Sequence, residues 1–294
     1  MSRLVLDLAA PESLEVRAML ASFALHAIPG AEVADAAAQT HQRVLPTSVG
    51  PVAVTLTLAT DAVRVRVDAG APVQADELTV IARRWLDFDT DLSAVRDVLG
   101  GDAVIGPLIG ARPGLRIIGY PNGFEAAVMT VLGQQVSLAA CRTFGGRLAA
   151  EWGTPGPGGL LLFPTPQQLA EVDAEDLQRR IRITGARART VHALAVACAE
   201  GLEISADGDR DDIRRRLLDV PGIGPWTADY LAVRVLADHD AFTPTDLVLR
   251  RALGGVSAKE ATAVSGRWAP YRAYALMHLW ASDPMNEDTP PAAP

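Results

Sequence analysis

A very short turn with the sequence VPGIGPW, residues 220–226, constrains the fold of this chain more than any other feature. Helical segments flank the turn over residues 211–220 and 226–237. Pro221 and Gly222 are typical of a place where a helix ends. We therefore expect two helices joined as a hairpin.

The residues after Gly222 indicate how the second helix begins. Pro225 suits the opening turn of a helix, and Ile223 can fill the space between the two helices. Gly224 is expected to need backbone angles that other residues avoid. The backbone N–H groups at such a helix start, that of Thr227 among them, point outward and bind anions such as a DNA phosphate. A helical hairpin without any ligand is the alternative.

Charge and composition bear on this hypothesis. The net charge of −8, taken alone, argues against nucleic acid as a partner. A binding face can nevertheless be locally basic, and a backbone anion site needs no basic side chain. The 27 basic residues are 26 arginines and a single lysine, Lys259. The hydrophobic fraction of 49% excludes a disordered chain.

Sequence features also narrow the cellular setting. No apolar run approaches the roughly 20 residues of a membrane helix, and the first residues lack the apolar segment of a signal peptide. Two cysteines, Cys141 and Cys198, are too few for a four-cysteine zinc or iron–sulfur site. They suggest a reducing compartment. We therefore expect a cytoplasmic protein that needs no cofactor and contacts no membrane.

The first 90 residues predict a small α+β domain. Apolar residues alternate with other residues over 4–8, and again over 52–58 and 63–67, where a turn between the two runs indicates a β-hairpin. Residues 12–27 and 76–86 have helical patterns. We expect an antiparallel sheet with helices on one face.

From about residue 90 the strand pattern fades and an all-α core of two helical subdomains is expected. Residues 123–238 form the subdomain with the hairpin, and residues 91–122 with 239–282 form the other. Residues 283–294 are expected to be a disordered tail, and residues 153–159 a loop. Further helices are predicted over 124–132, from the N-cap Ser137 to about Trp152, after the start signal Thr165-Pro166, and over 176–180, 187–201, 245–253, 258–267 and 270–282.

Several motifs together match one known family. They are LGQQVSLAA (132–140), RARTVHALA (187–195), RWAPYRAYALMHLW (267–280) and an aspartate, Asp246, twenty residues after Trp226. With the hairpin they resemble DNA-3-methyladenine glycosylase II, the alkylation-repair branch of the helix-hairpin-helix DNA glycosylases. The resemblance covers nearly the whole chain. It implies a monomer that excises bases such as 3-methyladenine and 7-methylguanine from double-stranded DNA.

The resemblance makes Asp246 the candidate catalytic residue. A carboxylate beside the sugar stabilises the positive charge that develops as the glycosidic bond breaks, and it can orient the attacking water. Capping the following helix is the other role of such an aspartate, and both can coexist. Related bifunctional enzymes carry a Schiff-base lysine just after the hairpin. Trp226 stands at that position here, so a monofunctional enzyme without lyase activity is expected.

Aromatic residues are candidates for the base pocket. Trp226 and Tyr230 share a helix face, and with Trp280 they match aromatic pocket positions of the family. An aromatic face attracts a cationic, alkylated base. Packing in a helical core is the alternative, and it is the expected role of Trp268, Tyr271 and Tyr274.

The resemblance also assigns a loop to the DNA. Gln134 and Gln135 stand where the family inserts a side chain into the minor groove to fill the gap left by the flipped base; an exposed turn is the alternative. Gln135 is polar where an apolar residue is usual. Leu247 and His26 also depart from the family, which often has an aromatic residue and an arginine there.

Some assignments stay open. The arginines of 179–189 and 214–216 either meet phosphates or lie on solvated helix faces. No metal is assigned with certainty, although the backbone carbonyls of Leu218, Val220 and Ile223 could hold a monovalent cation. A glycosylase for oxidised, deaminated or mismatched bases, and a non-catalytic helix-hairpin-helix DNA-binding module, are the alternative functions.

Overall fold

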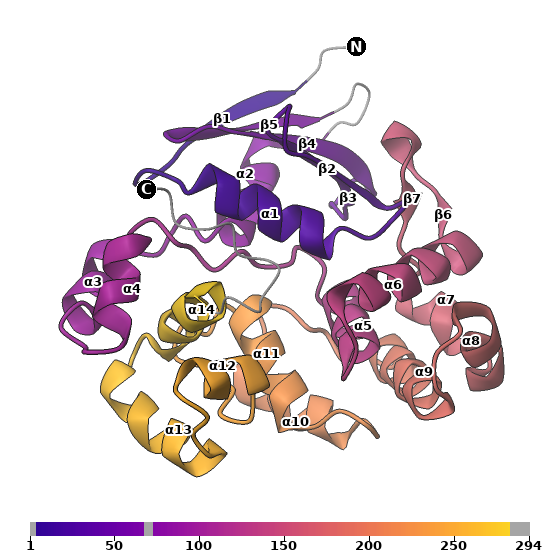
Figure 1. The fold of residues 1–294 in the computed structure, drawn as a ribbon. Helices are drawn as coiled ribbons and strands as arrows, with labels where there is room; N and C mark the ends of the chain where they lie inside the picture. Colours follow the sequence, from indigo (N-terminus) through magenta and orange to yellow (C-terminus); the bar gives the residue numbers. More distant parts are fainter. Residues whose placement is uncertain (1–3, 68–72, 283–294) are drawn as a thin grey trace.

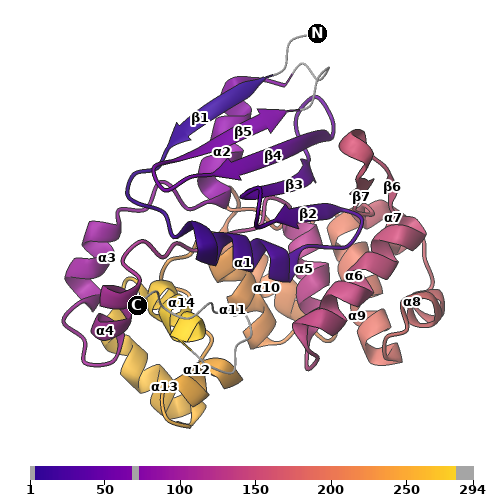
Figure 2. The same ribbon diagram turned by 45° about the horizontal axis from the view of Figure 1, so that its top comes forward.

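The computed structural model describes residues 4–67 and 73–282, so the predicted disordered tail lies outside the described residues. A sheet forms one end of the molecule, and helices form the rest (Figure 1). Helix α1 (Val16–His26) runs beneath the sheet, between it and the other helices (Figure 2). Among the described residues, no helix has the length and apolar character needed to cross a bilayer.

The N-terminal part is the antiparallel sheet that the alternation predicts. Its strand order is β1-β5-β4-β3-β2. Helices α1 and α2 (Ala75–Trp85) pack on one face, where Phe23 and Trp85 meet with ring centroids 5.5 Å apart. The strands are β1 (Val5–Ala9), β2 (Glu32–Asp35), β3 (Thr40–Leu45), β4 (Val52–Leu58) and β5 (Ala62–Val67).

Strands β2 and β3 were not predicted, for a physical reason. Two of the inward positions of β3 carry His41 and Arg43, both buried, so the apolar alternation that marks a half-buried strand is missing. The Arg43 guanidinium forms ion pairs with Glu32 and Glu125, at 3.3 Å and 2.7 Å. Long-range charge pairing therefore places a polar strand face against the core.

The remaining chain is helical, as predicted. Ser137 caps one helix. Thr165 and Gln168 form a capping box at the start of another helix, whose first residue is Pro166. The helices are α3 (Leu92–Leu99), α4 (Ile105–Ala111), α5 (Gly123–Gly133), α6 (Leu138–Trp152), α7 (Pro166–Ala170), α8 (Ala174–Ile181), α9 (Gly185–Ala199), α10 (Arg210–Asp219), α11 (Pro225–Arg234), α12 (Leu247–Ala252), α13 (Ala258–Ser265) and α14 (Arg272–Ser282), with a 3₁₀ turn over Gly266–Trp268.

One loop prediction was wrong. Within 153–159, the short strand β6 (Thr154–Pro155) pairs with β7 (Leu161–Leu162), and Pro157–Gly159 forms a 3₁₀ turn. Gly158 and Gly159 adopt positive φ, which closes this small hairpin. A β-ladder only two residues long therefore forms within a sequence whose glycines and prolines predict a loop.

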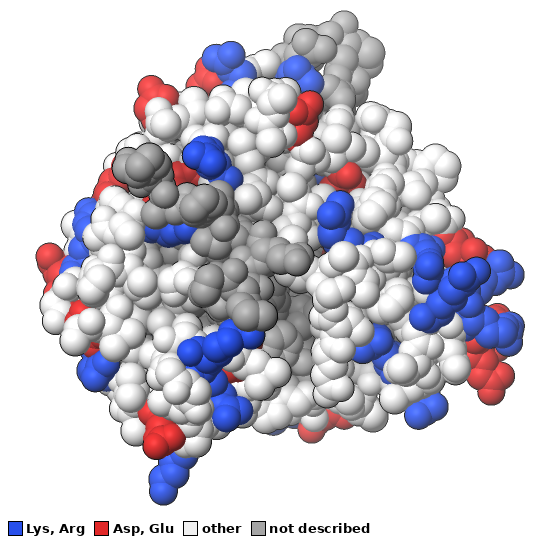
Figure 3. All heavy atoms as spheres, viewed as in Figure 1, with Lys and Arg blue, Asp and Glu red and all other residues white. Residues whose placement is uncertain are grey.

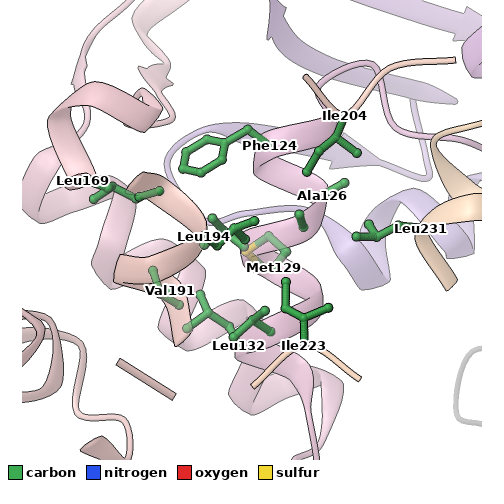
Figure 4. Close-up of a cluster of buried hydrophobic side chains, with 14 of the residues drawn as sticks. Phe124, Ala126, Met129, Leu132, Leu169, Val191, Leu194, Ile204, Ile223 and Leu231 are labelled. Carbon is green, nitrogen blue, oxygen red and sulfur yellow. The ribbon is translucent and has the colours of Figure 1, made fainter. Parts of the chain in front are cut away.

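Three hydrophobic clusters organise the interior. One lies between the sheet, α1 and α2; one joins α3 and α4 to α12–α14; the third surrounds α5. In the third, Phe124 and Leu132 of α5 pack with Leu194 of α9 and Ile223 of the hairpin turn (Figure 4). Trp268 and Tyr274 are fully buried, as expected. The division into three units stays a prediction, and these clusters support it.

Candidate active site

Helices α10 and α11 form the predicted hairpin through the turn at 220–224. Gly222 adopts φ +91°, and a Cβ there would lie 1.9 Å from Thr190 Oγ1 on α9. Glycine is therefore required both by the backbone angle and by the close approach of α9. The expectation for Gly224 was wrong: its φ is −103°, an ordinary extended angle, and a Cβ there would meet nothing within 4 Å.

Two of the residues predicted to meet DNA are turned inward. Ile223 packs in the helical core, and Thr227 is 2% exposed. Any contact of these residues with a phosphate is therefore limited to the backbone. Pro221 and Gly222 are exposed.

The loop between α5 and α6 lies against the hairpin. Gln134 Nε2 donates hydrogen bonds to the Gly222 carbonyl (3.3 Å) and to Thr227 Oγ1 (3.1 Å). Arg187 on α9 donates to the Gln134 carbonyl. Gln135 is exposed with φ +56°, a strained angle for a residue other than glycine. Gln134 thus ties the loop to the hairpin and leaves Gln135 at its exposed tip.

Asp246 caps α12 and is held by three donors. Its Oδ1 accepts from the Leu249 backbone N–H (2.8 Å) and from Trp280 Nε1 (3.0 Å), and its Oδ2 accepts from Trp226 Nε1 (2.9 Å). The side chain is 8% exposed. The capping role is therefore confirmed, and the carboxylate is fixed in one orientation beside the hairpin helix.

The three predicted pocket aromatics lie together, and the two tryptophans among them bond this carboxylate. Tyr230 stacks on Trp226 with ring centroids 5.3 Å apart, and its ring lies 5.8 Å from that of Trp280. The two tryptophans come from α11 and α14, which are far apart in the sequence. Leu247, the residue after Asp246, is 73% exposed.

A cavity of about 300 Å³, open to solvent, is lined by Asp246 and the three aromatics. His26 also lines it, and its Nδ1 bonds the Ser22 carbonyl at 2.8 Å. Burial, together with the nearby charge of Arg234, lowers the pKa of His26 to about 4. The imidazole is therefore neutral at pH 7.

Sequence reasoning missed many other polar residues of this cavity, among them Glu32, Tyr120, Glu125 and Arg234. Glu125 and Arg234 stand alone in otherwise apolar helical segments, FEAAV and LAVRV. An isolated charge in such a segment is the signal that could have found them, because a buried charge needs a partner or a function.

The two arginine runs are largely engaged within the protein. Arg179 and Arg180 pair with Asp176 and Glu151, and Arg214 pairs with Asp229. Basic side chains gather at the edge where α8 lies, mixed with acidic ones (Figure 3). These pairs favour the solvated-face interpretation for these three arginines.

Comparisons with known proteins agree with this geometry. Residues 5–122 match the AlkA N-terminal domain, and residues 128–263 match the HhH-GPD superfamily of base excision DNA repair proteins. DNA-3-methyladenine glycosylase 2 of Escherichia coli is 33% identical over 79% of this chain and 80% of its own length. The chain belongs to the AlkA family of DNA-3-methyladenine glycosylases.

Two further proteins are similar to this chain, one in sequence and one in structure. The "Probable bifunctional transcriptional activator/DNA repair enzyme AlkA" of Mycobacterium tuberculosis is 40% identical over 90% of this chain, which spans 54% of that relative's length. The 3-methyladenine DNA-glycosylase of Archaeoglobus fulgidus has the same fold, with a TM-score of 0.80 at 20% identity over 96% of this chain and 98% of that one.

Proposed function

We propose that this chain is a monofunctional DNA glycosylase that hydrolyses the glycosidic bond of alkylated bases flipped out of duplex DNA. The observation that carries the proposal is the Asp246 carboxylate, held by two indole N–H groups at an aromatic cavity. A buried, oriented negative charge stabilises a sugar cation without needing to reorganise. The family relationship and the hairpin beside the cavity support the same reading.

Three parts of the protein act in this mechanism: the hairpin, the loop with Gln135, and Asp246. The exposed turn at Pro221 and Gly222 and the N-terminus of α11 bind a phosphate through backbone N–H groups. The damaged nucleotide leaves the stack, at a cost of a few kcal/mol, and Gln135 fills the gap. Asp246 then stabilises the developing charge on the sugar while water attacks.

The attack by water follows from what the cavity lacks. The described part of the cavity has no lysine, and Lys259 lies exposed on α13. An imine with the sugar therefore has no amine to form it. The backbone carbonyls of Leu218, Val220 and Ile223 would be the ligands of a monovalent cation bound at the hairpin, and such a cation would take no part in the bond cleavage. We propose that the protein acts as a monomer in the cytoplasm.

The decisive experiment is a released-base assay on methylated duplex DNA. We expect free 3-methyladenine and 7-methylguanine, an intact abasic strand, and no protein–DNA adduct after borohydride treatment. Release of oxidised or mismatched bases alone would support the alternative function, a glycosylase for oxidised, deaminated or mismatched bases. Tight binding of DNA with no release of any base would support a non-catalytic module.

The two hairpin glycines should respond differently to alanine. Gly224→Ala should fold normally, because the new Cβ meets no protein atom within 4 Å. It should weaken binding to damaged and undamaged DNA alike, because the Cβ would obstruct an approaching phosphate. Gly222→Ala should also lower the melting temperature, because its Cβ collides with Thr190. Calorimetry and binding to both DNAs test this. A Gly224→Ala protein with unchanged affinity would contradict phosphate binding at the turn.

The indole N–H groups of Trp226 and Trp280 should contribute to base excision independently of stacking by their rings. Trp226→Phe and Trp280→Phe each remove one hydrogen bond to Asp246, worth about 1.5–3 kcal/mol for a charged acceptor. We expect excision of every substrate to fall roughly tenfold or more. Tyr230→Phe keeps its ring and leaves these two bonds intact, so it serves as the control in single-turnover kinetics. Loss confined to cationic bases would show that stacking alone matters.

A further inference from the structure

Arg187 on α9 contacts the loop that carries Gln135. One of its terminal N–H groups donates to the Gln134 carbonyl. Its guanidinium lies 5.9 Å from the centroid of the Phe144 ring on α6, and the residue is half-buried. The sequence left this arginine open between a phosphate contact and a solvated helix face, and these contacts describe neither.

The hydrogen bond from Arg187 acts on the peptide group that precedes Gln135. The Gln134 carbonyl belongs to the same planar unit as the Gln135 N–H. The angle φ of Gln135 sets how the rest of that residue is turned from this plane, and it is +56°. A residue with a side chain keeps such an angle only where its surroundings hold it. Arg187 therefore supplies a contact that holds Gln135 in this conformation.

The side chain of Gln134 fixes the same loop to the hairpin. Its Nε2 donates to the Gly222 carbonyl and to Thr227 Oγ1, so it is engaged within the protein. Thr190, three residues after Arg187, approaches Gly222 so closely that a Cβ there would lie 1.9 Å from its Oγ1. Helix α9 thus contacts both the loop and the turn, and Gln134 joins the two.

We propose that Arg187 and Gln134 are positioning residues for base flipping, which hold Gln135 in the orientation that enters the duplex. The proposal rests on the proposed function, and it changes Gln134 from a predicted DNA contact to a support of the loop. Because the loop is ordered before DNA arrives, it does not have to be ordered during flipping. The benefit is largest for a paired base, since a base without a partner leaves the stack at lower cost.

Single-turnover excision of 7-methylguanine opposite cytosine and opposite an abasic site tests the proposal. Arg187→Met should lose about tenfold on the paired base, because a charged hydrogen bond to the loop is gone. Opposite the abasic site the loss should stay below about threefold. Arg187→Lys keeps the charge and a donor and should retain most of the activity.

Arg147→Met on α6 is the matched control. It removes another half-buried arginine, which donates to the Ile181 carbonyl at 3.0 Å, and it leaves the contacts of the loop intact. This variant should not distinguish the two duplexes. Equal losses of Arg187→Met on the two duplexes would overturn the proposal.

A double-mutant cycle shows whether Arg187 acts through Gln135. Gln135→Gly removes the side chain and relieves the backbone, so it should slow excision of the paired base. Adding Arg187→Met should then change the rate little. Two losses that multiply would refute the proposal. A drop in the affinity of Arg187→Met for undamaged DNA as large as its loss of excision would refute it as well, because it would indicate a phosphate contact.

Two further measurements do not depend on the folding of the Arg187 variants or on the proposed function. Gln134→Met removes both bonds to the hairpin and should show the same substrate-dependent loss, with unchanged affinity for undamaged DNA; a lower affinity would show that Gln134 itself contacts DNA. Fluorescence of 2-aminopurine beside the damaged base reports unstacking without excision. A protein that flips the base but releases none would refute the proposed function alone. Flipping that is insensitive to both Arg187→Met and Gln134→Met would refute the positioning role.

Discussion

Asp246→Asn should abolish base excision while DNA binding is largely retained. The amide is nearly isosteric with the carboxylate but carries no charge, so the sugar cation loses its stabilisation. That loss is worth several kcal/mol, or about a hundredfold or more in rate. Single-turnover release of 3-methyladenine and a DNA-binding titration measure the two effects. A variant with more than about a tenth of the original rate would refute the catalytic assignment.

The hydrogen bonds around Asp246 suggest a sharper version of this experiment. Both carboxylate oxygens accept from indole N–H groups, so the NH₂ of an asparagine must face one of these donors. With its amide oxygen kept at the Leu249 cap, the NH₂ opposes Trp226. Combining Asp246→Asn with Trp226→Phe removes that conflict. We expect the double variant to recover the melting temperature that Asp246→Asn alone loses. It should remain inactive.

Arg43→Met should destabilise the protein by about 3–5 kcal/mol, because it leaves two buried carboxylates without their shared partner. Arg43 on β3 is 4% exposed and reaches Glu125 on α5, so it joins the sheet to the helical core. Its guanidinium also lies 5.6 Å from the ring of Trp85. Urea unfolding monitored by tryptophan fluorescence should show the change.

Two further variants separate lost charge pairing from lost packing. Arg43→Met combined with Glu125→Gln removes one of the uncompensated charges and should recover part of the stability. Arg64→Met breaks the exposed pair with Asp7 and should leave the unfolding midpoint almost unchanged. If Arg43→Met behaved like Arg64→Met, the buried pairs would contribute nothing to holding the sheet on the helices.

The sequence by itself determined most of the local structure. The apolar spacing, the caps at Ser137 and Thr165, and the PGIG turn act over a few residues, so they predict the helices and the hairpin directly. The alternation in β1, β4 and β5 predicts the sheet for the same reason. Asp246 followed from its distance to the hairpin and from the family resemblance.

Only the tertiary structure decided the features that depend on residues distant in the chain. Arg43 can line the inner face of β3 because Glu32 and Glu125 neutralise it. Gly222 is required, and Gly224 is not, because Thr190 of α9 approaches one glycine alone. Arg234 gains its place at the cavity because α11 packs its last turn against Tyr120. Sequence spacing reports neighbours within an element, whereas charge compensation and close packing are set by elements that meet only when the chain has folded.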